Sequence, residues 1–436
     1  MRTLNRELAT SVGETVTIQG WLHKKRLLGG LNFINLRDRS GLAQVLVAGE
    51  EIEKLRGLHI GTVLAVTGTV VADERAPGGA ELHDVTLEIM VPVTDEPPIE
   101  IDKPISHKSE NLDTLFDYRV LNLRNLQEQK IFKIRASLTR YIREYLTERE
   151  FVEIDTPKLL AEPTEGGAEV FKLDYFGKTA TLAQSPQFYK QIMVGVFERV
   201  FEIGHSYRAE PSATTRHLTE LTMLDIEMGF VEGHDEVLDT VGDMTSAVLK
   251  RVYDEHADDL KSLNAPALTL ADDGKVPRFT IAEIHEMYTR ATKTDTTAEK
   301  DLIPDEERWI SEHARKELGT DLVYAVRFPI EAGKFYHKMD PEDGTVLWGD
   351  LLFRGLEIAT VPLRENNYQK MIEQMKAAGL DVEHEGFKYY LQAFKYGLPQ
   401  HGGCGFGIDR LVQKTLGLNN VKEATLFPRD INRLTP

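Results

Sequence analysis

The hydrophobic period of the chain changes near residue 100, and this change divides the fold. Up to residue 93, apolar and polar residues alternate in short runs separated by glycine-containing turns: TVTIQGWLH, LNFINLRD, LAQVLVAG, TVLAVTGTVVAD and AELHDVTLEIMVPV. Period-two alternation is the pattern of half-buried strands. Five such strands predict a small β-barrel over residues 1–100. A basic, aromatic-bearing second strand suits an OB-fold, which often binds single-stranded nucleic acid; an unrelated small barrel also fits.

A proline-rich stretch, DEPPIEIDKPISH, follows the barrel and cannot continue a regular sheet. Together with DTLFDYRVLNLRN it predicts a linker over residues 101–129. Apolar residues then recur at helical spacing in IFKIRASLTRYIREYLTERE. Strands and helices follow without βαβ regularity, which predicts an α+β domain over residues 130–436. Within it, the acidic stretch 297–313 predicts a solvated helical insertion.

Composition excludes several classes of protein. The single cysteine, Cys404, rules out a disulfide framework and a cysteine-rich zinc site, and it favours a reducing, cytoplasmic location. Neither a membrane span nor a signal-peptide core is present in the sequence. The net charge of -18 argues against nonspecific coating of nucleic acid. However, five basic residues against one acid in residues 21–39 predict a local nucleic-acid contact.

The glycine-rich segment HGGCGFGIDRL, residues 401–411, matches neither a phosphate-binding Walker loop nor a dinucleotide fingerprint. In a strand, Gly403, Gly405 and Gly407 would leave one face bare, so that a flat ligand could approach the backbone. Arg410 follows and could cover that ligand or pair with its phosphates. Packing of the core explains the glycines equally well.

A polar hairpin is predicted over residues 207–230, YRAEPSATTRHLTELTMLDIEMGF. Arginine suits bidentate phosphate contact, and a nearby acid can accept an amino group or orient an arginine. The hairpin therefore predicts a triphosphate site, with ordinary solvated ion pairs as the alternative. Its candidate residues are Arg208, Glu210, Arg216, His217 and Glu220.

The segment QSPQFYKQ places polar residues between apolar runs. Ser185 before Pro186 predicts a helix that starts at this point, with Ser185 as its N-cap. On that helix, Gln187 and Lys190 share a face. This polar face needs a partner; a surface lysine that reaches solvent is the alternative.

Together, these segments resemble the class II aminoacyl-tRNA synthetases, and within them the aspartyl-tRNA synthetases, over essentially the whole chain. Residues 131–157, 199–230 and 401–416 resemble motifs 1, 2 and 3 of that class. The resemblance implies an OB-fold joined to an antiparallel-sheet catalytic domain with flanking helices. It also implies ATP-dependent ligation of L-aspartate to tRNA through an aspartyl-adenylate, with Mg²⁺, in a homodimer formed through motif 1.

The resemblance further implies roles for residues. Arg208 and Arg410 would be catalytic, holding the α-phosphate and closing over the purine. The ATP site would comprise Arg208, Glu210, Arg216, His217, Glu357, Gly407 and Arg410. The aspartate site would comprise Glu165, Gln187, Lys190, Arg208, Thr360 and Arg364. Mg²⁺ would bind Asp350, Glu357 and Thr360, since it prefers hard oxygen ligands. A lysine with an arginine selects a negative side chain over a neutral amide.

In the barrel, Arg26, Phe33 and Gln44 match the family's anticodon-reading pattern, with Phe33 stacking on a base and Gln44 contacting the central uracil. Without the family, Phe33 would be an ordinary core residue. His23 and Pro77 resemble the subgroup with relaxed specificity, which charges both tRNA(Asp) and tRNA(Asn). A tRNA-dependent amidotransferase is then an expected partner.

The segment EIATVPLR departs from the family, which usually has a serine and two glycines before Gln-Arg at this place. Thr360 can replace the serine hydroxyl, but Val361 and Pro362 lack the backbone freedom of glycine. Three functions therefore stay open. They are an aspartyl enzyme, an asparaginyl or otherwise shifted ligase, and a synthetase-like protein that binds RNA without efficient catalysis.

Overall fold

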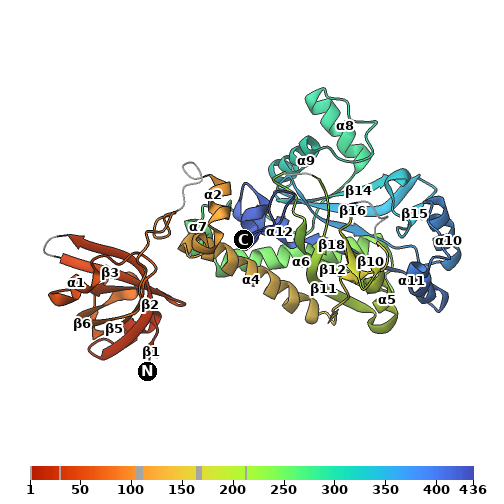
Figure 1. Ribbon diagram of the computed structural model, residues 1–436. Coiled ribbons are helices and arrows are strands. Elements are labelled where there is room, and N and C mark those ends of the chain that lie inside the picture. The colour runs from red at the N-terminus through yellow and green to blue at the C-terminus, as the bar shows by residue number, and fades with distance from the viewer. Residues whose placement is uncertain (1, 29–30, 105–110, 164–168, 212–213) are drawn as a thin grey trace. The chain divides into compact units, whose positions relative to one another are not determined.

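The structure is a computed structural model, and it describes residues 2–28, 31–104, 111–163, 169–211 and 214–436. The chain forms two compact units, Met1–Gln129 and Lys130–Thr435, each built around its own apolar core (Figure 1). Among the described residues, no helix is long and apolar enough to cross a membrane.

The first unit is a closed β-barrel. Its strands are β1 (Arg2–Thr3), β2 (Thr15–Leu28), β3 (Leu31–Asp38), β4 (Gly41–Leu46), β5 (Val63–Ala72) and β6 (Ala80–Val91). They follow the order β1-β2-β3-β4-β6-β5, and β5 also pairs with β2. The closed ring therefore has five strands, β2 to β6, and the short β1 lies beside β2. Alternate residues such as Ile34, Leu36, Ala43 and Val45 are buried inside, so the predicted five-stranded OB-type barrel is confirmed.

Short helices connect and follow the barrel strands. They are the 3-10 turns η1 (Asn5–Thr10) and η2 (Pro77–Gly79) and the helices α1 (Glu50–Leu55), α2 (Leu112–Asp117) and α3 (Arg119–Asn122). Arg119 and Glu128 form a buried ion pair at 2.7 Å that ties α3 to the first turn of the next helix. The segment after the proline-rich stretch is therefore helical and anchored.

A large mixed sheet dominates the second unit, in the order β13-β14-β16-β17-β18-β12-β11-β7, with β15 beside β16. Among the described residues of this sheet, β7–β11 and β13–β14 are parallel pairs and the other pairs are antiparallel. Its strands are β7 (Val152–Glu153), β11 (Arg199–Tyr207), β12 (Glu220–Gly229), β13 (Arg278–Thr280), β14 (Leu322–Pro329), β15 (Met339–Asp340), β16 (Thr345–Phe353), β17 (Glu357–Pro362) and β18 (His401–Gly407). A small sheet contains β8 (Leu159–Leu160), β9 (Lys172–Tyr175) and β10 (Lys178–Leu182).

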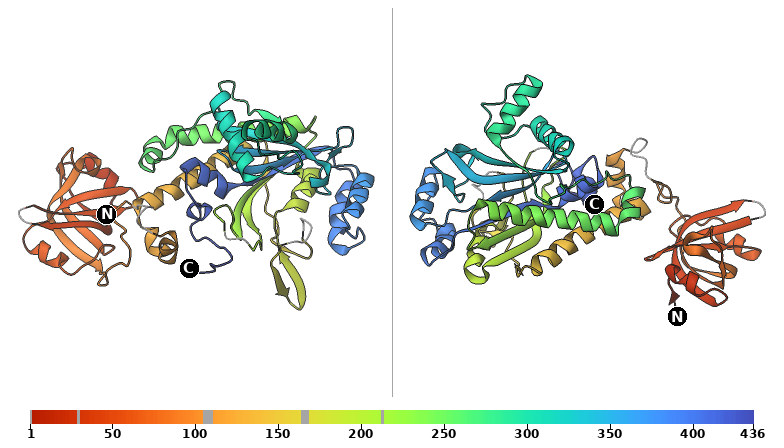
Figure 2. Two further views of the ribbon diagram at one scale, coloured as in Figure 1. Left: turned by 90° about the horizontal axis from the view of Figure 1, so that it is seen from above. Right: turned by 180° about the vertical axis from the view of Figure 1, so that it is seen from behind.

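Two long helices, α4 and α6, cover one face of the large sheet (Figure 2). Apolar residues at helical spacing bury one stripe of each helix against alternate residues of β12, namely Leu224, Ile226 and Met228. Asp225 and Glu227 alternate with these apolar residues and lie on the other face of the sheet.

The helices of the second unit are α4 (Leu126–Thr147), α5 (Gln187–Phe197), α6 (His234–Glu255), α7 (Ala257–Ser262), α8 (Ile281–Thr292), α9 (Pro304–Glu317), α10 (Tyr368–Ala377), α11 (Glu385–Lys395) and α12 (Ile408–Leu416), with 3-10 turns η3 (Ile330–Ala332) and η4 (Val421–Ala424).

Two local expectations were wrong. Pro186, not Ser185, is the N-cap of α5, because the Pro186 carbonyl already accepts from the N–H of Lys190 at 2.9 Å. The acidic insertion is not simply solvated. In α9, Ile310 and Ala314 are buried in a core shared with β14, and the buried Glu306 accepts from His285 at 2.8 Å. Because the buried carboxylate of Glu306 has a hydrogen-bond partner, this acidic helix can pack against β14 without leaving a charge unpaired.

Candidate active site

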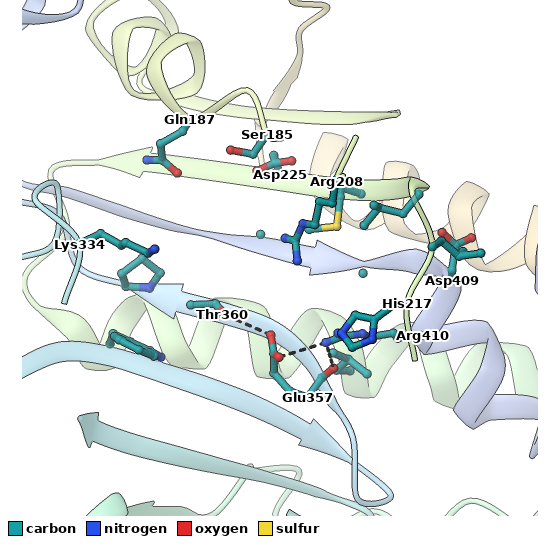
Figure 3. A pocket seen from close by; sticks show the side chains of 18 of the residues that line it. Ser185, Gln187, Arg208, His217, Asp225, Lys334, Glu357, Thr360, Asp409 and Arg410 are labelled. Atoms are coloured by element: carbon teal, nitrogen blue, oxygen red, sulfur yellow. Dashed lines mark hydrogen bonds and ion pairs between the residues drawn. The ribbon is translucent and has the colours of Figure 1, made fainter. Parts of the chain in front are cut away.

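A single cavity gathers side chains from α5, the β11–β12 hairpin, β16, β17 and β18 (Figure 3). Most of the predicted ATP and aspartate residues line it: Gln187, Lys190, Arg208, Glu210, Arg216, His217, Glu357, Thr360, Arg364, Gly407 and Arg410. Glu165 lies outside the described residues. The sequence therefore identified side chains that are far apart along the chain and close together in space.

At one end of the cavity, Lys190 is only 2% exposed and has oxygen partners on two strands. Its Nζ donates to Asp225 Oδ1 at 2.7 Å and to the carbonyl oxygen of Cys404 at 2.9 Å. Glu227 Oε2 lies 3.8 Å from the same nitrogen. A buried ammonium needs such pairing, so the lysine does not reach bulk solvent.

Arg364 is the second buried cation. It lines the cavity although it ends the segment EIATVPLR, which differs from the usual family sequence. Its Nε and Nη2 donate to the two carboxylate oxygens of Glu227 at 3.0 and 3.1 Å. Burial alone would raise the pKa of Glu227, but the charges of Arg364 and Lys190 outweigh burial and lower it. The guanidinium also lies 5.3 Å from the ring centroid of Tyr336. The geometry is the bidentate pairing that arginine favours.

A hydrogen-bonded network fixes the amide of Gln187. Gln187 Nε2 and the hydroxyl of Tyr390 both donate to Gln191 Oε1 at 2.9 Å. Gln191 Nε2 lies 2.9 Å from His401 Nε2, and His401 Nδ1 lies 2.8 Å from the carbonyl oxygen of Pro399. Because the amide nitrogen of Gln187 is held by Gln191, its oxygen is left to the cavity.

The opposite end of the cavity carries the cations predicted to bind phosphates (Figure 3). Arg410 Nη1 donates to the carboxylate of Glu357 at 3.0 Å, and Arg216 forms an ion pair with Glu307 of α9. Glu210 lies 3.8 Å from Arg208 and 3.5 Å from His217. Each of the three arginines thus has a carboxylate partner, so an incoming polyphosphate replaces pairs that are already formed. Burial lowers the pKa of His217, so its ring is neutral near pH 7.

Asp350 and Glu357 form a carboxyl pair below the cavity wall. Asp350 faces Thr360 across the β16–β17 ladder, and Thr360 Oγ1 donates to Glu357 at 3.1 Å. Burial, and then the charge of Glu357, raise the pKa of Asp350 well above its usual range. Burial opposes ionisation of Glu357 as well, yet Arg410 and Arg208 lower its pKa. Glu357 therefore has its counter-charge in Arg410, whereas Asp350 does not have enough positive charge nearby to offset its burial. The oxygens of Asp350, Glu357 and Thr360 are the hard ligands that would suit Mg²⁺.

The glycine-rich strand β18 serves packing and cavity alike. Gly405 and Gly407 line the cavity, and a side chain at Gly407 would meet only Arg410 at 3.6 Å or more. Gly403 is different, because a Cβ there would collide with the carbonyl oxygen of Ile226 in β12. Two of the three alternating glycines therefore leave a bare surface, and the third permits close strand approach.

On the barrel, Arg26, Phe33 and Gln44 share the outer face of β2, β3 and β4. Arg26 pairs with Phe33 across the ladder and its guanidinium is 5.9 Å from the ring. Gln44 Nε2 donates to Glu81 at 2.7 Å. His23 is buried at a bulge in β2, and Pro77 is half-buried in η2. The structure thus brings three of the five predicted anticodon residues onto one open sheet face.

Several residues of the site were missed from the sequence. Asp225 and Glu227 had a signal, since two acids alternate within the apolar run TMLDIEMGF and need buried cations. Glu307, Tyr390 and His401 had none, because their partners Arg216 and Gln191 are distant in sequence. Gln191 lies only four residues from its partner Gln187 and was also missed.

Comparison with known proteins agrees with this geometry. A family model described as "tRNA synthetases class II (D, K and N)" matches residues 111–431, and a second model, for an OB-fold nucleic acid binding domain, matches residues 16–93. The aspartate–tRNA(Asp/Asn) ligase of Thermus thermophilus is 40% identical over 436 residues, covering 100% of both chains. The aspartate–tRNA(Asp) ligase of Pyrococcus horikoshii is 38% identical, covering 97% of each.

Among solved structures, asparaginyl-tRNA synthetase from Pyrococcus horikoshii, complexed with asparaginyl-adenylate, superposes with a TM-score of 0.89 at 31% identity, covering 98% of this chain and 97% of that one. A putative aspartyl-tRNA synthetase from Leishmania major gives 0.90 at 28% identity, covering 100% and 95%. The chain therefore belongs to the class II tRNA synthetases of the D, K and N group, with an N-terminal OB-fold nucleic-acid-binding domain.

Proposed function

We propose that the protein ligates L-aspartate to tRNA at the expense of ATP, through an aspartyl-adenylate. The observation that carries this is the pair of buried cations, Lys190 and Arg364, in the same cavity as the phosphate-binding set around Arg208 and Arg410. Two cations suit the side-chain carboxylate of aspartate, because a neutral amide would leave them less well compensated. The curated relatives that charge aspartate support the same substrate.

In the first step, the aspartate α-carboxylate attacks the α-phosphate of ATP and pyrophosphate leaves. Arg208 holds the α-phosphate, and Arg410 closes over the purine that lies against Gly405 and Gly407. These residues position the reactants and offset developing charge, so no protein nucleophile is required. Asp350, Glu357 and Thr360 would hold Mg²⁺, which would supply further charge neutralisation at the phosphates. A ribose hydroxyl of the terminal adenosine of tRNA then takes the aspartyl group from the adenylate as an ester, and AMP leaves.

The barrel face reads the anticodon, with Phe33 as a stacking surface and Gln44 and Arg26 as polar contacts. The tRNA is that for aspartate and also that for asparagine, in line with His23, Pro77 and the Asp/Asn specificity named for the relative from Thermus thermophilus. A chain that makes Asp-tRNA(Asn) works with a tRNA-dependent amidotransferase in the cytoplasm.

The enzyme acts as a homodimer through motif 1. Strand β7 ends the large sheet, and its Val152 is 39% exposed next to α4. An edge strand with an exposed apolar side chain favours coverage by a second copy.

ATP–pyrophosphate exchange with single amino acids tests the activity. We expect exchange with aspartate, loss of exchange in Lys190→Met, and charging of both tRNA(Asp) and tRNA(Asn) transcripts. Exchange with asparagine instead would identify an asparaginyl enzyme, the alternative favoured by the likeness to the asparaginyl-adenylate complex. Absence of exchange with retained tRNA binding would identify a synthetase-like RNA-binding protein, and an untouched tRNA(Asn) would exclude dual specificity.

A further inference from the structure

His337 lies at the amino-acid end of the cavity, in a position fixed by the backbone. It lines the cavity, is 4% exposed, and forms an antiparallel bridge with Arg364. The hydrogen bonds flank this pair, since Lys338 N donates to Leu363 O at 2.9 Å and Glu365 N donates to Tyr336 O at 3.1 Å. Directly opposed residues in such a pair carry their side chains on the same face, close together. The imidazole is therefore a neighbour of the Arg364 side chain.

Two aromatic rings hold the orientation of this imidazole. The ring centroids of His337 and Trp348 are 5.5 Å apart, with an angle of 61° between the ring planes. Those of His337 and Tyr336 are 4.9 Å apart, with an angle of 79°. The Trp348 indole is itself held, because Nε1 donates to Asp350 at 2.8 Å. A ring packed against two fixed rings has little rotational freedom.

The hydrogen bonding of His337 determines which nitrogen carries the proton. Nδ1 accepts from the main-chain N–H of Lys334 at 3.3 Å. Burial, and then the positive charges of Arg364 and Lys334, lower the pKa of His337 well below its usual value. The ring is neutral near pH 7, so its proton is on Nε2. Among the described residues, Nε2 has no hydrogen-bond partner.

The neighbouring cations, Lys190 and Arg364, differ from the Nε2–H donor of His337 because each already forms an ion pair with a buried carboxylate. Lys190 is paired with Asp225, and Arg364 takes both oxygens of Glu227. These four charges sum to zero, so an anionic side chain entering the cavity gains less from the two cations than their charges alone suggest. A neutral N–H donor without a partner of its own adds an interaction that no buried carboxylate weakens.

We propose that His337 is a specificity-determining residue, whose Nε2–H donates to a side-chain oxygen of the amino-acid substrate beside Arg364. This inference rests on the proposed function for the identity of that oxygen, the β-carboxylate of aspartate. A donor at this point selects substrates that carry an acceptor at the end of a short side chain. It disfavours apolar side chains, which would leave the buried N–H unpaired.

The test compares KM values in ATP–pyrophosphate exchange for the full-length chain. His337→Phe keeps a ring and removes the donor, and His337→Met is a second donor-free variant of different shape. His337→Gln places an amide N–H near the position of Nε2. We expect the KM for aspartate to rise about tenfold or more in the donor-free variants and to return to within about threefold of the original in His337→Gln. The KM for ATP should not change.

Lys334→Met is the matched control, because Lys334 also lines the cavity but is exposed. Equal aspartate KM values for the original chain and a folded donor-free variant would overturn the inference. So would a loss shared by aspartate and ATP, or a larger effect of Lys334→Met. Calorimetric binding of a sulfamoyl analogue of aspartyl-adenylate gives the same comparison for slow variants. If the unchanged chain exchanges with asparagine, the proposed function fails, and the same KM ratios measured with asparagine judge His337.

Discussion

At the residue scale, the proposed metal ligands Asp350 and Glu357 should couple metal binding to pH. Because burial and Glu357 raise the pKa of Asp350, its carboxyl retains a proton to higher pH than usual, and Mg²⁺ must displace that proton. Affinity for Mg²⁺ should therefore fall as pH falls. We expect the Mg²⁺ concentration for half-maximal exchange to rise by up to about tenfold for each pH unit below that pKa.

Asp350→Asn is the comparison for this prediction. The amide has no proton to release, so the variant should require more Mg²⁺ at neutral pH but show a much flatter pH dependence. Titrations of exchange activity with Mg²⁺ at several pH values measure both quantities. An equally steep pH dependence in Asp350→Asn would show that another group controls metal binding.

Glu227 is the direct counter-charge of the buried Arg364, and it lies 3.8 Å from Lys190, whose nearer carboxylate is Asp225. Its pKa is lowered in the folded chain, so it stabilises the fold above its unfolded pKa of about 4.3, and this contribution is lost as pH falls through the folded value. Glu227→Gln leaves Arg364 with no full counter-charge, and breaking a buried pair costs about 3 kcal/mol. Urea unfolding at pH 7 should show that loss.

The same Glu227→Gln variant should approach the unchanged chain in stability on acidification, because the original carboxylate is then protonated too. Glu312→Gln is the control: this exposed carboxylate pairs with Lys316 on α9, and such pairs contribute little. A difference between Glu227→Gln and the original chain that does not shrink toward acid would assign the loss to packing and not to charge.

At the scale of elements, the segment EIATVPLR shows what the sequence could and could not predict. Its replacements suggested a disturbed amino-acid site. In the structure, however, Val361 and Leu363 are buried in the core, whereas Thr360, Pro362 and Arg364 line the cavity. Period-two alternation was readable in the sequence, and of Val361, Pro362 and Leu363 it places only Pro362 at the cavity. The Glu227 partner of Arg364 lies 137 residues away, and no local pattern gives that pairing.

Helix α9, which begins in the acidic stretch 297–313, contacts through the Glu307–Arg216 ion pair the β11–β12 hairpin, which is proposed to bind phosphates. The Glu307 side chain is mostly buried, so it holds the Arg216 guanidinium in place beside the cavity. Glu307→Ala removes that anchor, and a net hydrogen bond of about 0.5–1.5 kcal/mol corresponds to a rise of about 2- to 10-fold in the KM for ATP. The KM for aspartate should not change in these exchange measurements.

Glu312→Ala, on the solvent side of the same helix, should leave both KM values unchanged. A lower KM for ATP in Glu307→Ala would reverse the interpretation, because Glu307 would then compete with phosphate for Arg216. The comparison separates anchoring from competition at a contact that the acidic composition of residues 297–313 did not predict.

At the scale of the whole molecule, the proposed function assigns amino-acid activation to the second compact unit and anticodon reading to the first. The barrel has its own closed core, and the cavity is built entirely from Lys130–Thr435. Both architectures followed from hydrophobic period, since a closed barrel and a helix-covered sheet bury alternate residues in recognisable patterns. The anchoring of α3 by the Arg119–Glu128 pair did not follow, because it depends on two buried charges meeting.

A chain beginning at Asn111 should therefore retain amino-acid activation and lose efficient charging. This start keeps α2, α3 and the Arg119–Glu128 pair, whose loss would leave a buried charge uncompensated at the start of α4. We expect exchange with aspartate at unchanged KM values for aspartate and ATP. Charging of tRNA should fall by about 100-fold, as a loss of about 2.7 kcal/mol of binding would give. The full-length Phe33→Ala variant should reproduce part of the charging defect with normal exchange, since it removes the stacking surface alone. Defective exchange in a folded Asn111 fragment would instead show that the barrel supports the chemistry of the cavity.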